Sequence, residues 1–259
     1  MIGYEERLKK SILNHKSGKH KNPIDDYAYK LKGYKIAREC NVRTAIIYGV
    51  YSSPDEVEWE ELPDKFVIKP QRGCSESGVF PLVYQESKLY VDLLRHEVGT
   101  LEDFIAKYRE GTRLEKGGHS LGLWIEELIA DPIPYDWKFY TFNGEIGIIR
   151  QYARTRRPKV TKFWTKNFEE IPDVAKKVWT YQIDNSLPGP IHPSELIAGA
   201  KCISKKVKYP FVRVDLYDTC KGVYFGEITP HPGMEILLNN EWDEELGKLW
   251  EKAERELNE

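Results

Sequence analysis

The stretch "FVRVDLYDTCKGVYFGEITPHPGM", residues 211–234, constrains the fold more than any other part of the chain. Two short apolar runs flank the turn "DTCKG", which is the pattern of a β-hairpin. Because side chains alternate along a strand, Arg213 and Asp215 share one face of the first strand. With the turn near residues 221–222, Glu227 on the second strand faces Asp215. Charged residues are rarely buried in a sheet unless they are paired or bind a metal. The hairpin therefore predicts a site as well as a sheet.

Two facing carboxylates allow two interpretations. They repel each other and raise each other's pKa unless a cation lies between them, and such hard oxygen ligands suit Mg²⁺. Alternatively, Arg213 forms a salt bridge with one of the acids on a solvated face. The residues alone leave both interpretations open.

The charge balance of the 259-residue chain excludes several classes of protein. Lys and Arg number 39 against 41 Asp and Glu, so the net charge of −2 favours neither nucleic acid nor a membrane surface as a partner. The N-terminus lacks the apolar segment of a secretory leader, and no apolar run reaches membrane-spanning length. We therefore expect a cytoplasmic protein without membrane insertion, whose four cysteines are reduced thiols.

The other patterns predict helices mixed with hairpins. Helices are expected at residues 3–14, 25–40, 100–111, 193–208 (with Ser194 as its cap) and 239–257. Strands are expected at 43–50, 65–70, 79–84, 88–94, 122–129, 135–142 and 146–153. The Asn-Gly pair at 143–144 marks a tight hairpin turn. Consecutive strands pair mostly as hairpins, which favours an antiparallel α+β fold over a doubly wound parallel sheet.

A lysine at the end of a strand suggests phosphate binding. Lys69 closes "KFVIKP" and precedes the loop "QRGCSESG", residues 71–78. The lysine offers a point charge, and the backbone N–H groups of such a loop can close over phosphates. The loop is not a Walker A motif, and a surface lysine before a turn is the simpler alternative.

Acidic and basic residues also end two other strands. In "WIEELI", Glu126 or Glu127 could accept ribose hydroxyls, or both could be exposed at a strand end. In "YDWKFYTFNGEIGIIRQYARTRR", Lys138 shares a strand face with Asp136, and Arg150 falls on the partner strand. Cations that converge in this way suit phosphoryl transfer. The cluster at residues 154–157 either holds an anionic substrate or is solvated.

The order of these elements resembles the ATP-grasp superfamily. Within it, the chain is most similar to the teichuronopeptide-biosynthesis (TupA-like) group, over roughly residues 25–250. The segment "EITPHPGM" also resembles the E-x-N-x-x-P-G-M ending of D-alanine–D-alanine ligases. The resemblance implies an ATP-grasp fold, in which two α+β subdomains with antiparallel sheets clasp ATP. The single unit 1–259 would then comprise an N-terminal segment (1–60), a small subdomain (61–130) and a C-terminal subdomain with the metal site (131–259).

The resemblance also implies roles for individual residues. The expected ATP-binding residues are Lys69, Arg72, Gly73, Ser75, Gly78, Glu126, Glu127 and Leu128. The expected catalytic residues are Lys138, Arg150 and Arg213, the last of which stabilises an oxyanion. The expected Mg²⁺ ligands are Asp215, Glu227 and Thr229. The expected substrate contacts are His231 and Arg154.

The sequence departs from the superfamily at three points. Thr229 stands where an Asn ligand is usual, which affects the second metal position. Cys74 and Ser75 occupy a loop that is richer in Gly in relatives. No separate N-terminal domain is expected before the grasp, so the acceptor side would be open to a glycan or a peptide.

The implied activity is that of an ATP-dependent carboxylate–amine ligase. ATP phosphorylates a carboxylate, an amine attacks the acyl phosphate, and ADP and phosphate leave, with a cell-surface polysaccharide or its precursor as a suggested substrate. An ATP-grasp kinase that phosphorylates a hydroxyl and a nucleotide-binding module without turnover are the alternatives. A nucleic-acid binder using basic loops at 15–21 and 154–162 is the weakest, because no matching motif is present. A homodimer is left open.

Overall fold

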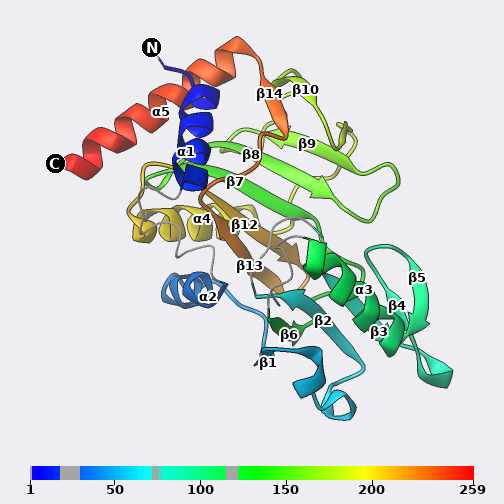
Figure 1. Cartoon of the computed structure of the whole chain (residues 1–259). Helices are drawn as coiled ribbons and strands as arrows, with labels where there is room; N and C mark the ends of the chain where they lie inside the picture. The colour runs from blue at the N-terminus through cyan, green and yellow to red at the C-terminus, as the bar shows by residue number, and fades with distance from the viewer. Residues whose placement is uncertain (1, 18–29, 72–75, 77, 115–121) are drawn as a thin grey trace. The chain divides into compact units, whose positions relative to one another are not determined.

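The computed structural model describes residues 2–17, 30–71, 76, 78–114 and 122–259. The chain divides into two compact units, each built around its own sheet (Figure 1). Unit 1 comprises Met1–Thr44 and Pro134–Glu259, and unit 2 comprises Ala45–Ile133. Almost all strand pairs are antiparallel, so the α+β prediction is confirmed. Among the described helices, none is both long and apolar enough to cross a membrane.

Unit 2 contains a six-stranded antiparallel sheet in the order β1-β6-β2-β3-β4-β5. Its elements are β1 (Ile47–Tyr51), β2 (Lys65–Pro70), β3 (Phe80–Tyr84), β4 (Leu89–Asp92), β5 (Glu97–Thr100), α3 (Leu101–Leu114) and β6 (Leu123–Glu127). On β2, Phe66 and Ile68 pack with Phe104 of α3 in the core. Because side chains alternate, Lys69 lies on the face of the sheet opposite to this core.

Unit 1 contains the second six-stranded sheet, in the order β11-β9-β8-β7-β12-β13, and a two-stranded sheet, β10-β14. Its strands are β7 (Asp136–Phe142), β8 (Glu145–Ala153), β9 (Val160–Trp164), β10 (Ala175–Val178), β11 (Gln182–Ile183), β12 (Val212–Thr219), β13 (Gly222–Thr229) and β14 (Ile236–Leu238). Its helices are α1 (Tyr4–Ser17), α2 (Lys30–Glu39), α4 (Pro193–Val207) and α5 (Asn240–Asn258). All pairs in the large sheet are antiparallel except β11 with β9.

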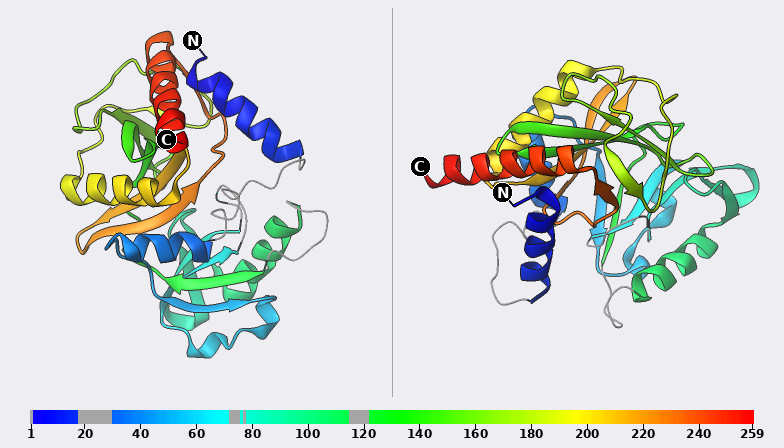
Figure 2. Two further views of the ribbon diagram at one scale, coloured as in Figure 1. Left: turned by 90° about the vertical axis from the view of Figure 1, so that its left-hand side faces the viewer. Right: turned by 90° about the horizontal axis from the view of Figure 1, so that it is seen from above.

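The two faces of the unit 1 sheet are covered by different helices. Helix α4 packs against β7, β8 and β12, with Gly199 beside Leu216. On the other face, α1 and α5 lie side by side near the N-terminus (Figure 2). They bury Tyr4 and Trp250 against Tyr140 and Phe211, and the rings of Phe211 and Trp250 are 4.8 Å apart. Arg213, which lies directly opposite Tyr140 on the neighbouring strand, belongs to this second face.

Most predicted elements are confirmed, including the hairpin turn at Asn143 and Gly144, whose φ values are 46° and 91°. Ser194 is not the cap of α4, because the helix begins with Pro193, whose fixed φ suits the first helical turn. The basic segment 154–162 is not a loop throughout, because Lys162 lies on β9 and is only 2% exposed. The predicted residues 25–29 of the second helix lie outside the described part of the chain.

The prediction of reduced cysteines is wrong for two of the four. Cys40, directly after α2, forms a disulfide with Cys202 on α4. The two are 162 residues apart in sequence, so only the packing of α2 against α4 brings them together. Cys220 is a free, exposed thiol, and Cys74 lies outside the described residues.

Candidate functional site

The charged residues of unit 1 gather where β7, β8, β12 and β13 lie side by side. Asp215 pairs in register with Glu227 on one neighbouring strand and with Lys138 on the other, and Lys138 pairs with Arg150. The predictions that Asp215 faces Glu227 and that Arg150 lies on the partner strand of Lys138 are therefore confirmed. Val212, Val214 and Leu216 point to the opposite face, where α4 packs, so strand alternation alone separates the charges from that core.

Arg213 and Asp215 form a bidentate ion pair at the centre of this group. Arg213 Nε lies 2.7 Å from Asp215 Oδ1, and Arg213 Nη2 lies 2.7 Å from Oδ2. Burial alone would lower the pKa of the Arg213 guanidinium, but the charge of Asp215 outweighs it and raises the pKa. The predicted salt bridge exists, but it is buried rather than on a solvated face. Arg213 is thus a permanent, fixed cation.

Lys138 joins two buried carboxylates. Its Nζ contacts Asp215 Oδ2 and lies 3.0 Å from Asp136 Oδ2. Asp136 is also bound by Arg154, whose Nε donates a hydrogen bond of 3.0 Å. Burial would lower the pKa of Arg154, but the charge of Asp136 outweighs it and raises the pKa. Arg154 thus neutralises Asp136, a residue to which the sequence pattern assigned no role of its own; its expected contact with the substrate stays a prediction.

Glu227 and Thr229 form the accessible edge of the network. The Glu227 side chain is 41% exposed and lies 3.3 Å from Arg213 Nη2, whereas Thr229 Oγ1 lies 3.0 Å from the same nitrogen. Burial acts to raise the pKa of the Glu227 carboxyl, but the charges of Lys138 and Arg213 outweigh it and lower the pKa to about 2. Glu227 is therefore a carboxylate at any physiological pH.

The donor set of Asp215, Glu227 and Thr229 fits Mg²⁺. Two carboxylates and a hydroxyl are hard oxygen ligands, and a partial set suits an ion that keeps water and substrate phosphates as its other ligands. In the described parts of the chain, no group of three or more His, Cys, Asp and Glu side chains could hold a metal ion by itself. An ion here would also compete with Lys138 and Arg213 for Asp215.

Arg150 belongs to a second cluster, which the sequence did not predict. Its Nη1 lies 3.3 Å from Glu235 Oε2, and the Tyr152 hydroxyl donates a hydrogen bond of 2.7 Å to the same oxygen. Arg150 is fully buried and stacks on Tyr152, and its Nη2 has no hydrogen-bond partner among the described residues. Glu235 directly follows the "PHPGM" motif, so its position next to that motif was the only available signal.

In unit 2, Lys69 and Glu126 form an ion pair on the face of the sheet opposite α3. Lys69 Nζ lies 2.5 Å from Glu126 Oε1, and Trp124 Nε1 donates a hydrogen bond of 2.8 Å to Glu126 Oε2. Both charged side chains are largely buried, so Lys69 is not a surface lysine. Glu126 is therefore not an exposed residue at a strand end, because it binds Lys69 and Trp124; its expected contact with the ribose of ATP stays a prediction.

Of the remaining predicted ATP-binding residues, the structure describes three and leaves three outside the described part of the chain. Glu127 accepts a hydrogen bond of 3.2 Å from the Ile46 backbone, and Leu128 is half-buried after the end of β6. Gly78 has a φ of +70°, a conformation that favours glycine. Arg72, Gly73 and Ser75 lie outside the described residues.

His231, the other predicted substrate contact, lies in the segment between β13 and β14. Its Nδ1 is 3.1 Å from Ser11 Oγ of α1, and its ring stacks on that of His15 with centroids 4.6 Å apart. The end of β13 is therefore tied to the N-terminal helix within unit 1.

Comparisons with known proteins agree with this geometry. The model of the TupA-like ATP-grasp family matches residues 7–251, so the chain belongs to this family and has an ATP-grasp fold. Among solved structures, D-alanine–D-alanine ligase from Bacillus anthracis is similar with a TM-score of 0.56 at 18% identity, covering 90% of this chain and 69% of that one.

The same enzyme complexed with ATP gives a TM-score of 0.54 at 18% identity over 90% of this chain and 67% of that one. D-alanyl-alanine synthetase A from Vibrio cholerae gives 0.50 at 13% identity over 88% of this chain and 60% of that one. At these identities the likeness shows the fold alone. A comparison with curated proteins gave no match.

Proposed function

We propose that this protein is an ATP- and Mg²⁺-dependent carboxylate–amine ligase. The observation that carries the proposal is the buried network of Lys138, Arg213 and Asp215, with the ionised Glu227 at its accessible edge. A buried network of fixed cations and carboxylates is what phosphoryl and acyl transfer require, because such transfer is accelerated mainly by preorganised charge.

Each half of the fold would contribute a separate part of the chemistry. Lys69, oriented by Glu126, would bind ATP phosphates together with the loop that ends at Gly78. Asp215, Glu227 and Thr229 would hold Mg²⁺, which neutralises charge on the phosphates when bound. Lys138 would contact the transferred phosphoryl group. Arg213 would stabilise the oxyanion that forms when the amine attacks the acyl phosphate.

No residue of this set has to act as a nucleophile. The carboxylate substrate attacks the γ-phosphorus of ATP and releases ADP, and the amine then displaces phosphate from the acyl phosphate. The protein supplies alignment and charge, which together account for most of the rate in such reactions. The similarity to D-alanine–D-alanine ligase supports amide formation, and membership of the TupA-like ATP-grasp family supports ATP-dependent chemistry. The teichuronopeptide resemblance suggests a cell-surface polysaccharide or its precursor as the substrate.

The experiment that tests the proposal is ADP and phosphate release from Mg-ATP with a panel of carboxylates and amines. We expect release to require both a carboxylate and an amine, and Asp215→Asn to abolish it. The control is Asp92→Asn, which removes the charge from an equally buried aspartate that is paired with Arg95 in unit 2. Asp92→Asn should lower stability but leave turnover per folded molecule intact. Normal turnover by Asp215→Asn, or release driven by a hydroxyl compound alone, would contradict the proposal.

A further inference from the structure

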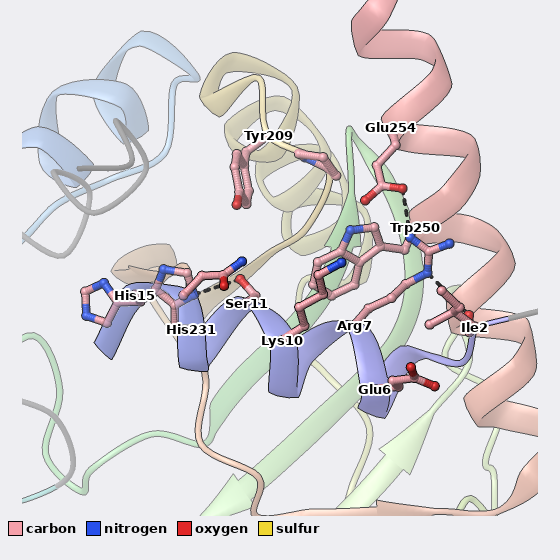
Figure 3. Close-up of a pocket in the computed structure, with 12 residues that line it drawn as sticks. Ile2, Glu6, Arg7, Lys10, Ser11, His15, Tyr209, His231, Trp250 and Glu254 are labelled. Atoms are coloured by element: carbon pink, nitrogen blue, oxygen red, sulfur yellow. Dashed lines mark hydrogen bonds and ion pairs between the residues drawn. The ribbon is translucent and has the colours of Figure 1, made fainter. Parts of the chain in front are cut away.

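A pocket of about 340 Å³ lies within unit 1, between α1 and α5 (Figure 3). Arg7, Lys10 and Ser11 of α1 form one wall, whereas Tyr209 and Trp250 form the other. Small-molecule sites typically start at about 300 Å³ and combine an aromatic lining with a few polar groups. The pocket therefore has room for one amino acid or one sugar unit.

One residue that lines the pocket lies close in sequence to the candidate metal ligands. His231, which lines the pocket, is two residues beyond Thr229 at the end of β13. The contact of His231 Nδ1 with Ser11 Oγ, 3.1 Å, fixes this segment against α1. A ligand in the pocket would thus touch the same segment that continues from Glu227 and Thr229.

Among the described charged residues that line the pocket, one cation, Lys10, is not neutralised by a carboxylate. Arg7 Nη1 lies 2.7 Å from Glu254 Oε2, so these two charges neutralise each other. Glu6 is the other lining carboxylate, and Figure 3 shows it below α1, on the side away from Tyr209. Lys10 is exposed and forms no ion pair or hydrogen bond within the described parts of the chain. An ammonium group at the edge of a partly aromatic pocket favours an anionic ligand.

We propose that this pocket binds the non-reacting end of an acidic co-substrate, and that Lys10 selects for its carboxylate. The proposal rests on the ligase function and adds a substrate class to it: a compound that carries a carboxylate besides the group that reacts. An acidic amino acid and an acidic sugar share this chemistry, so the experiment includes both.

The test is direct binding, measured without ATP. The chain has six histidines, so the imidazole NMR signals of labelled protein are few, and His15→Gln identifies one of the two at the pocket. The probes are L-glutamate against L-glutamine, and D-glucuronate against D-glucose. We expect at least one acidic probe to shift the His15 and His231 signals saturably, and more strongly than its neutral partner. Lys10→Gln should weaken that probe about fivefold, the upper end for an exposed ion pair.

Lys9→Gln is the matched control, because Lys9 is an exposed neighbour on α1 that does not line the pocket. Equal shifts with acidic and neutral probes, no shift with any probe, or equal losses in the two lysine variants would overturn the pocket assignment. Because the readout needs no ATP, its failure is separate from that of the ligase proposal. Binding without turnover would refute only the ligase, and turnover without binding would refute only the pocket.

Discussion

Lys138→Met should reveal whether Mg²⁺ binds at Asp215 and Glu227, because the free energy of unfolding of this variant should depend on Mg²⁺. Lys138 is the one side chain that contacts both Asp136 and Asp215 among the described residues, and these two carboxylates are 1% and 2% exposed. Removing one partner of a buried ion pair costs about 3–5 kcal/mol. Each carboxylate here keeps an arginine, Arg154 or Arg213, so we expect a loss near the lower end, about 3 kcal/mol.

The loss should depend on Mg²⁺. Without Lys138, Asp215 and Glu227 share the single positive charge of Arg213, and a divalent cation can replace the missing ammonium group. An ion present at a hundred times its Kd stabilises the folded state by about 2.7 kcal/mol. Urea unfolding of Lys138→Met in MgCl₂ should therefore recover much of the loss, compared with KCl of equal ionic strength.

Lys162→Met provides the matched control. Lys162 is a second buried lysine of unit 1, but it binds Glu170 and the carbonyls of Asn185 and Leu187. Its removal should also be destabilising, without any recovery in Mg²⁺. If Lys138→Met lost the same free energy in MgCl₂ as in KCl, Asp215 and Glu227 would not be a Mg²⁺ site.

Two further predictions concern unit 2. Glu126→Gln removes the charge that pairs with Lys69 but keeps a hydrogen-bond acceptor for Trp124. The free energy of unfolding, measured by urea titration, should therefore fall by about 2 kcal/mol. An unchanged free energy of unfolding would contradict the ion pair. Hydrogen bonds from the backbone and then the side chain of Thr100 lower the pKa of the Asp103 carboxyl below its ordinary value of 3.8. Its contribution to stability is therefore present above that value and is lost as the pH falls through the lower folded pKa. Asp103→Asn should be less stable than wild type at neutral pH and equally stable in strong acid, with Glu102→Gln as the control; a gap that persists in acid would refute this.

The sequence predicts the hairpin site well because strand geometry is local. With a turn near residues 221–222, alternation placed Arg213 and Asp215 on one face of β12, and a register shift between Asp215 and Leu216 brings Glu227 opposite Asp215. The Asn-Gly turn likewise predicted that Arg150 lies on the partner strand of Lys138, but a register shift between Tyr140 and Thr141, which the sequence did not predict, sets the two residues opposite each other. The chemical roles of these residues remain predictions.

The missed contacts are those between segments that are distant in sequence. Glu235 reaches Arg150 across 85 residues, and Cys40 reaches Cys202 across 162. No periodicity within a strand or a helix predicts which loop packs on which strand end. The ion pair of Arg154 with Asp136 was not predicted either, because nothing local shows that Asp136 needs a second cation.

The position of the charge network follows from how the unit 1 sheet is covered. One face of β7 and β12 is largely apolar because α4 packs on it, so Lys138, Arg213 and Asp215 lie on the other face. That face is closed over Tyr140 and Phe211 by α1 and α5, and Arg213, opposite Tyr140, stands at the boundary between core and site. The N-terminal helix thus buries the core with Tyr4 and Leu8, while Lys10 and Ser11, one turn further along, line the pocket. Because one helix serves both purposes, a substitution in its buried face should affect stability and ligand binding together.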